Sequence, residues 1–146
     1  MFEKILVSYD GSDHARNALD TAIGMSKTFG SELYVSHTPQ VDTPPIVVGA
    51  FVDVLQVPPT ADQIRKAGQH ICDEARAIAE EAGAGIRDCY VGSGNPATST
   101  LTTADKVGAD LIVMGRRGLG SIKALALGSV SQAVSHGAKC AVMTVV

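Results

Sequence analysis

Short apolar runs alternate along this chain with longer segments in which apolar residues recur at helical spacing. The clearest helical segment is 61–82, where Ile64, Ala67, Ile71, Ala75 and Ile78 fall on one face. This alternation is typical of a parallel sheet whose strands are joined by crossover helices. The pattern predicts strands at 5–9, 32–37, 86–91, 110–114 and 140–146, and helices at about 15–29, 61–82, 96–107 and 129–136.

The character of each strand predicts its place in the sheet. The run 110–114 is apolar throughout its body, which indicates a strand buried on both faces. Arg87 and Asp88 within 86–91 indicate an exposed or edge strand. With right-handed crossovers, we expect an α/β fold with one doubly wound, Rossmann-like sheet of five mainly parallel strands, in the order 3-2-1-4-5, with helices on both faces. A chain of 146 residues predicts a single domain spanning 1–146.

The segment 38–60 breaks this regular pattern. Its prolines make a regular helix or a central strand unfavourable, and a connection of this length in a small domain usually has a function of its own. Apolar residues within it indicate that it packs against something, and both a subunit contact and a flap over the sheet edge fit. The prolines are Pro39, Pro44, Pro45, Pro58 and Pro59.

Composition narrows the function classes. Apolar residues make up 45% of the chain and charged residues 18%, as in a compact globular protein. A net charge of −3 and few aromatic residues argue against a general nucleic-acid binder. Apolar runs stay short of the roughly 20 residues that a membrane span needs, and the N-terminus lacks the layout of a secretory signal. We therefore expect a cytoplasmic protein with no membrane insertion and no nucleic-acid partner.

Cysteine and histidine positions predict no metal centre. Cys72, Cys89 and Cys140 are odd in number and far apart, so we expect reduced, buried thiols rather than a disulfide or a zinc site. The histidines share no metal-ligand spacing, which favours surface or structural roles for them. They are His14, His37, His70 and His136.

The predicted strand order places a ligand site between the first and fourth strands, where the winding reverses. Ligands of open parallel sheets bind beyond the carboxyl ends of the strands at such a reversal. Ser8, Tyr9 and Asp10 end the first strand, and the glycine-rich segment 114–120 ends the fourth. Gly115, Gly118 and Gly120 within that segment let the backbone approach a ligand closely, because they carry no Cβ.

A helix that begins at Gly128 and Ser129 adds free backbone N–H groups and partial positive charge. Together with the hydroxyls of Ser129 and Ser131 and with Arg117 or Arg116, these groups could hold a polyphosphate. The motif is neither a Walker A loop nor the GxGxxG fingerprint.

Simpler interpretations of the same residues stay open. The glycines are also common turn residues, and Gly128 could simply begin a helix. Asp10 also fits a helix cap or an Asx turn, and Arg116 fits a solvated surface charge.

The spacing Gly115-x2-Gly118-x9-Gly128-Ser129 resembles the G-2x-G-9x-G-(S/T) signature of ATP-binding universal stress proteins. The segments 4–19, 94–115 and 109–145 are also similar to this family, whereas 38–60 has no counterpart in it. The resemblance implies the adenine nucleotide alpha-hydrolase-like version of the Rossmann-like fold. It covers most of the chain.

The resemblance also implies a set of binding residues. Asp10 would reach the adenosine portion, and His37, Thr38 and Pro39 would form the second wall of the base pocket. Tyr9 departs from the proline or small residue of other members, so it could crowd or reshape that pocket. The predicted nucleotide-binding residues are Ser8, Tyr9, Asp10, Pro39, Met114, Gly115, Arg117, Gly118, Gly128, Ser129, Val130 and Ser131.

The implied function is ATP binding in a stress-response regulatory protein that acts through nucleotide-dependent assembly or partner binding. The implied ligand is ATP, or AMP or ADP, with Mg²⁺. A slow ATP-hydrolysing enzyme and a nucleotide-independent partner-binding module stay open as alternatives, and no catalytic residue is assigned. We further expect a homodimer through strand 140–146, a possible tetramer, and an unidentified regulatory partner protein.

Overall fold

Five parallel strands form the central sheet of the protein. The structure, a computed structural model, describes residues 1–41, 46–48, 53–55, 57–119 and 127–146. Its main sheet has the order β5-β2-β1-β6-β7, which confirms the predicted order of the five long strands. The elements of this unit are β1 (Lys4–Ser8), α1 (Asp13–Phe29), β2 (Glu32–His37), α2 (Ala61–Glu81), β5 (Ile86–Val91), α3 (Pro96–Val107), β6 (Leu111–Gly115), α4 (Ser129–Gly137) and β7 (Ala141–Val145).

Strands β1 and β6 meet at the centre of the sheet and are its most buried part. Ile5 pairs with Leu111 of β6 on one side and with Leu33 of β2 on the other. All five residues of β6 are buried, as its continuous apolar run predicts. Strand β5 lies at one edge and β7 at the other. The polar residues of β5 therefore have the edge position that the sequence indicates.

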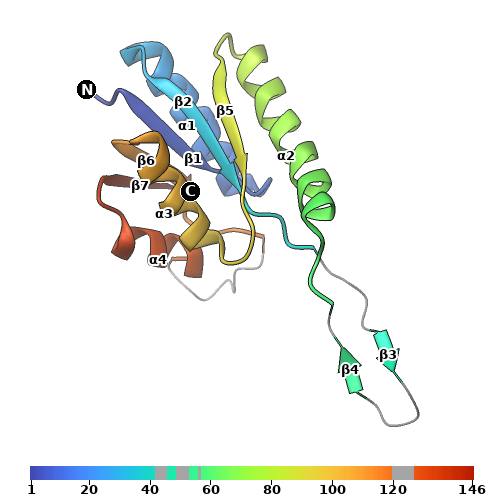
Figure 1. The fold of residues 1–146 in the computed structure, drawn as a ribbon. Helices are drawn as coiled ribbons and strands as arrows, with labels where there is room; N and C mark the ends of the chain where they lie inside the picture. Colours follow the sequence, from blue (N-terminus) through green and yellow to red (C-terminus); the bar gives the residue numbers. More distant parts are fainter. Residues whose placement is uncertain (42–45, 49–52, 56, 120–126) are drawn as a thin grey trace.

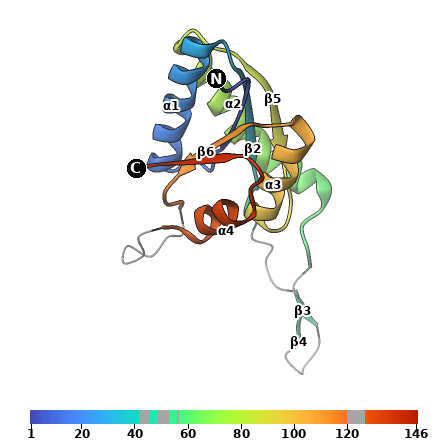
Figure 2. The ribbon, with the colours of Figure 1, turned by 90° about the vertical axis from the view of Figure 1, so that its left-hand side faces the viewer.

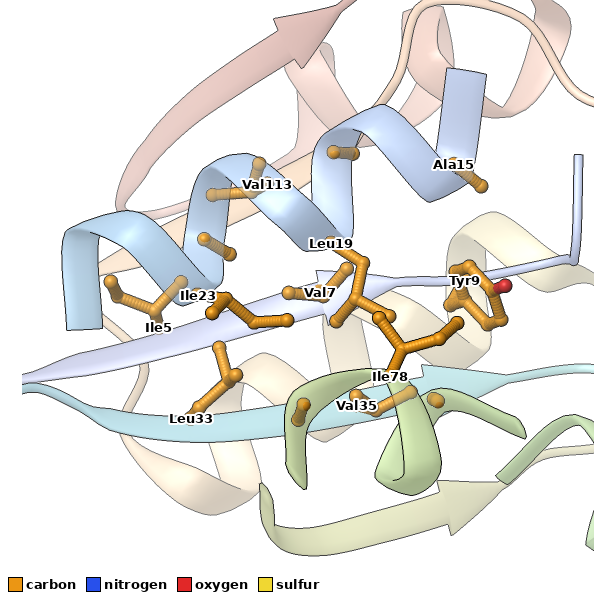
Figure 3. Packing of buried hydrophobic residues seen from close by; sticks show 14 of the residues in the cluster. Ile5, Val7, Tyr9, Ala15, Leu19, Ile23, Leu33, Val35, Ile78 and Val113 are labelled. Atoms are coloured by element: carbon orange, nitrogen blue, oxygen red, sulfur yellow. The ribbon is translucent and has the colours of Figure 1, made fainter. Parts of the chain in front are cut away.

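Two layers of apolar side chains join the sheet to its helices. Helices α1 and α2 cover one face, where Leu19 and Ile78 meet Val7 and Val35 (Figure 3). Helices α3 and α4 cover the other face, over a cluster that includes Ile112 and residues of β7. Each fully buried aliphatic side chain contributes about 1.5–3 kcal/mol relative to an exposed one.

Three of the helices begin with a side-chain cap that the sequence supplies. Ser12 accepts a hydrogen bond from the backbone of Ala15 at the start of α1, and Asn95 does the same for Thr98 at the start of α3. Thr60 and Gln63 form a reciprocal capping box at the start of α2. Gly30 ends α1 in the left-handed conformation, with a φ of 71°.

The proline-rich segment contributes a short hairpin outside the main sheet. Strands β3 (Ile46–Val48) and β4 (Asp53–Leu55) pair in antiparallel fashion. Figures 1 and 2 show that they project beyond the end of α2, away from the five-stranded sheet. No helix or central strand lies in the described part of this segment, as its prolines predict. The side chains that would decide between a subunit contact and a flap over the sheet edge lie outside the described residues.

The structure corrects the prediction for two of the three cysteines. Cys72 of α2 and Cys89 of β5 form a disulfide, with their Cα atoms 6.0 Å apart. The chain turns back after α2 and enters β5, which packs against that helix. A strand rises about 3.3 Å per residue and a helix about 1.5 Å, so a few strand residues return the chain to the level of Cys72. The spacing of the cysteines along the sequence did not predict this disulfide. Cys140 is a free thiol, as predicted.

None of the helices in the described part of the chain is long and apolar enough to cross a membrane.

Two helical glycines provide a matched test of the packing between α2 and β5. A Cβ on Gly68 would lie 2.3 Å from Cγ1 of Val91, whereas a Cβ on Gly24 of α1 would meet nothing within 4 Å. We expect Gly68→Ala to lower the free energy of unfolding by about 1–3 kcal/mol through overpacking. Gly24→Ala should raise it by up to about 1 kcal/mol, because alanine favours a helix.

Urea denaturation of both variants measures these changes. Equal stabilities for the two alanine variants would contradict the close helix-to-strand approach.

Candidate functional site

A cavity of about 540 Å³ opens at the carboxyl ends of β1, β2 and β6. The four helices α1, α2, α3 and α4 and the loops that follow these strands contribute the rest of its wall. All of the sequence-predicted binding residues line this one cavity, although they come from four separate segments of the chain. They are Ser8, Tyr9, Asp10, Pro39, Met114, Gly115, Arg117, Gly118, Gly128, Ser129, Val130 and Ser131.

Three glycines of the predicted signature are closely packed: a Cβ would collide with the protein at Gly115 and Gly118 and would be in tight contact at Gly128. A Cβ on Gly115 would lie 2.8 Å from the backbone nitrogen of Ala15, at the first turn of α1. A Cβ on Gly118 would lie 2.5 Å from Oδ2 of Asp10, and a Cβ on Gly128 would lie 3.2 Å from the carbonyl oxygen of Arg116. The signature therefore permits close packing around the cavity. Gly120 lies outside the described residues.

Asp10 anchors the glycine loop, residues 115–119 at the end of β6, to the end of β1. Its Oδ1 accepts a hydrogen bond from the backbone N–H of Ser12 at 3.0 Å, which is an Asx turn. Its Oδ2 accepts one from the backbone N–H of Leu119 at 3.2 Å. The Asx turn that the sequence left open is therefore present, and the same carboxylate also lies on the cavity wall.

Ser131 ties α4 to the same loop. Its side chain is buried, and its hydroxyl donates to the carbonyl oxygens of Gly115 at 2.9 Å and Arg116 at 3.1 Å. The backbone N–H of Gly128 donates to the carbonyl of Arg116 as well. In this structure the Ser131 hydroxyl proton is directed to the loop backbone. We therefore assign Ser131 a role in positioning the loop.

The N-terminus of α4 differs from those of the other three described helices. Its N-cap residue, Gly128, has no side chain to cap it, whereas α1, α2 and α3 each have a side-chain cap. Ser129 and Val130 of its first turn lie on the cavity wall. Uncapped N–H groups at a helix N-terminus carry partial positive charge and favour an anionic ligand.

Arg117, which carries a positive charge, also lies on the cavity wall, and its Cα would be 3.4 Å from a Cβ on Gly128 at the start of α4. Its Nε is buried and has no hydrogen-bond partner among the described residues, and the same is true of Nε of Arg116 and Nδ1 of His14. Among the described residues, no carboxylate forms an ion pair with either arginine. Arg116 is half-buried and lies off the cavity wall, so it is not the fully solvated charge that the sequence favoured.

Tyr9 does not crowd the cavity, although its size raised that possibility in the sequence. Its ring is only 1% exposed and lies in the core layer beneath α1 and α2 (Figure 3). Its hydroxyl donates a short hydrogen bond to the Glu74 carboxylate of α2. Burial, and then this carboxylate, raise the pKa of Tyr9 far above its ordinary value, so the hydroxyl keeps its proton. Tyr9 thereby connects the end of β1 to α2.

His37 closes the second wall at the end of β2. Its Nδ1 lies 2.8 Å from the carbonyl oxygen of Tyr9. A carbonyl oxygen can only accept, so Nδ1 carries the proton and donates it. Burial lowers the pKa of His37, while the Tyr9 carbonyl and the Asp10 charge oppose that shift. The neutral ring is therefore the form that fits this position near neutral pH.

Sequence reasoning missed the parts of the wall that come from α1, α2 and α3. Ala67 and Ile71 lie on the apolar stripe of the predicted helix 61–82, which the pattern assigned to the core. Thr100 is buried in α3 and shares a hydrogen bond with Ser8 at 3.3 Å. No local signal separates such residues from ordinary core positions. The missed wall residues are Ala15, Gln40, Ala67, Ile71, Pro96, Thr100 and Leu119.

The protonation of His37 generates a testable pH dependence. Burial lowers the pKa of His37 in the folded protein below 6.5, its ordinary value in an unfolded chain. The unfolded chain therefore binds the proton more readily than the folded protein does. The contribution of His37 to stability should be complete above pH 6.5 and be lost as the pH falls through the lowered folded pKa. His37→Asn keeps a donor for the Tyr9 carbonyl but does not titrate.

We expect thermal unfolding between pH 7.5 and 5 to show a smaller loss of stability in His37→Asn than in the wild-type protein. Parallel curves for the two proteins would contradict a neutral, buried His37.

Comparison with known proteins identifies the family of this chain. The family model described as "Universal stress protein family" matches residues 1–146. The chain is 34% identical to universal stress protein YxiE of Bacillus subtilis over 99% of both sequences. It is 36% identical to the "Universal stress protein in QAH/OAS sulfhydrylase 3'region" of Thermus aquaticus, again over 99% of both.

A solved structure agrees with these sequence matches. A universal stress protein in complex with cAMP superposes with a TM-score of 0.73 at 27% identity, covering 99% of this chain and 97% of that one. The matched fold includes the parallel sheet and the helices that surround the cavity. The chain therefore belongs to the universal stress protein family.

Proposed function

We propose that this protein binds ATP, or a related adenine nucleotide, as a regulatory component of a stress response. The observation that carries the proposal is the uncapped N-terminus of α4, which meets Arg117 and the glycine loop on one cavity wall. Backbone N–H groups at a helix N-terminus and an arginine side chain are the usual ligands of phosphate groups. This side of the cavity is thus suited to a polyphosphate.

Another part of the cavity wall suits a nucleobase. A volume of about 540 Å³ is in the range of small-molecule sites. Pro39, Ile71 and Met114 give this wall apolar surface for a flat ring. The family relative that superposes on this chain at 27% identity is described as a complex with cAMP, an adenine nucleotide. The chemistry of the wall and this relative support the same ligand class.

Mg²⁺ fits the proposal as an ion held mainly by the nucleotide. The described residues contain no cluster of three or more histidine, cysteine or acidic side chains that could form a metal site of their own. Mg²⁺ commonly keeps several waters and binds phosphate oxygens with only one or two protein ligands. Asp10 is the carboxylate on the cavity wall that could serve in this way.

The hydrogen bonds already formed on the cavity wall favour a binding role over efficient catalysis. Asp10, the carboxylate on the cavity wall, already accepts hydrogen bonds from Ser12 and Leu119. A catalytic base must be free to take a proton from the attacking group. We therefore propose that nucleotide occupancy, through its effect on assembly or partner binding, carries the signal.

Gly118→Val tests the nucleotide site directly. The new side chain would meet the Asp10 carboxylate, push the loop from its position and enter the phosphate side of the cavity. We expect ATP binding, measured by calorimetry with Mg²⁺ present, to fall by at least tenfold, about 1.4 kcal/mol.

Gly85→Val is the matched control, because a Cβ on Gly85 meets nothing within 4 Å. It should bind ATP as the wild-type protein does. The proposed site is wrong if Gly118→Val folds normally and keeps wild-type affinity. ADP production in the same samples reports any slow hydrolysis.

We also propose that β7 forms a homodimer by pairing with its counterpart in a second copy. Strand β7 pairs with β6 on one side and is an edge of the sheet on the other. The Val145 carbonyl accepts from the backbone of Arg116 in the loop after β6, so the alternate residue Thr144 directs its backbone outward. An exposed edge of this kind readily pairs with another chain.

Thr144→Pro removes one outward N–H, and Thr144→Ala is its matched control. We expect the wild-type protein and Thr144→Ala to sediment as dimers at micromolar concentration, and Thr144→Pro to sediment as a monomer. Monomeric wild-type protein under these conditions would contradict the proposed dimer.

A further inference from the structure

The disulfide between Cys72 and Cys89 links one wall of the cavity to an edge of the sheet. Cys72 lies on the buried face of α2 and is 3% exposed. Cys89 lies on the edge strand β5 and is only partly buried. One sulfur is thus enclosed, while the residue that carries the other is accessible to solvent.

Helix α2 reaches the cavity immediately before its cysteine. Ile71, the neighbour of Cys72 in sequence, and Ala67, one helical turn earlier, are both wall residues. The same part of α2 is fastened by two non-covalent contacts, the close packing of Gly68 on Val91 and the hydrogen bond from Tyr9 to Glu74. Within the described residues, the disulfide is the only covalent cross-link between side chains of this wall and the sheet.

We propose that Cys72 and Cys89 form a thiol–disulfide exchange site whose redox state sets the nucleotide affinity of the neighbouring cavity. The exchange site stands on the geometry of the two cysteines alone. Its coupling to affinity rests on the proposed nucleotide-binding function. The reductant that acts on it is a dithiol, either a small molecule or the active site of a dithiol protein.

Exchange begins at the accessible residue. A thiolate of the dithiol attacks Sγ of Cys89, the S–S bond breaks, and Cys72 leaves as a thiolate that takes up a proton. The second thiolate of the reductant then attacks the reductant's other sulfur, which is bonded to Cys89 in the mixed disulfide. This step releases Cys89 as a thiolate, which takes up a proton. Two electrons and two protons pass to the protein, and the reductant becomes a disulfide. An oxidised dithiol reverses both steps.

The third cysteine lies apart from this chemistry. Cys140 immediately precedes β7, at the opposite edge of the sheet from β5. Burial raises the pKa of its thiol above the ordinary value, which lowers the thiolate fraction available for attack. Cys140→Ser is therefore a matched control that removes a thiol but leaves the exchange pair intact.

Breaking the disulfide should weaken nucleotide binding through the α2 wall. The bond limits the movement of Ile71 and Ala67 relative to β5 before any ligand arrives. Without it, that wall has more freedom, and the ligand must restrict it on binding. We expect about a three- to tenfold rise in the Kd for ATP, which corresponds to ordering a small number of side chains. Hydrogen exchange in α2 should become faster in the reduced protein.

The experiment compares oxidised and dithiothreitol-reduced wild-type protein with Cys72→Ala/Cys89→Ala and Cys140→Ser. Thiols are counted after denaturation, the ATP Kd is measured by calorimetry, and hydrogen exchange is followed along α2. The oxidised wild-type protein should show one free thiol and the reduced protein all three. The reduced protein and the double variant should bind ATP more weakly than the oxidised protein. Cys140→Ser should keep the full redox response.

Each part of the proposal has its own contrary result. Three free thiols after treatment with oxidised dithiothreitol would overturn the exchange site. Equal ATP affinity in the oxidised and reduced states, with the thiol count confirming both states, would overturn the coupling. If neither state binds ATP, the proposed function fails and the coupling with it, while the thiol count still decides the exchange site.

Discussion

The cavity depends on how closely the loop after β6 approaches the end of β1. Gly115 and Gly118 allow contacts with α1 and with the Asp10 carboxylate that a side chain would prevent. The two oxygens of that carboxylate then hold backbone N–H groups on both sides of the crevice, at Ser12 and at Leu119. A single charged side chain thus fixes the relative positions of two segments that are more than one hundred residues apart.

This arrangement also determines the electrostatics of the site. Ser131 and Gly128 hold the first turn of α4 against the loop, so the uncapped end of that helix faces the cavity. Arg117 lies on the same wall without a carboxylate partner among the described residues. Positive charge that the protein leaves uncompensated in a cavity is most readily balanced by an anionic ligand. The residues that hold the loop in place therefore also line this part of the cavity.

Different contacts hold the α2 side of the cavity in place. Tyr9 reaches Glu74 from the core, Gly68 packs closely on Val91, and Cys72 is bonded to Cys89. These contacts fix an apolar wall rather than a charged one. The family resemblance raised the possibility that Tyr9 would crowd the base pocket, but its ring is directed into the core layer. The bulky residue therefore strengthens the connection to α2.

The amino-acid sequence alone determined the strand order and the glycine signature, and it indicated the segments at the ends of β1 and β6 that line the cavity. These features depend on local periodicity and on short spacings, which are visible along the chain. Only the tertiary structure revealed the disulfide, the wall formed by Ile71 and Thr100, and the commitment of Ser131 to the loop backbone. Each of these requires two distant segments to meet at a particular register. An apolar stripe indicates that a helix face is buried, but the packing of the whole fold decides what that face contacts.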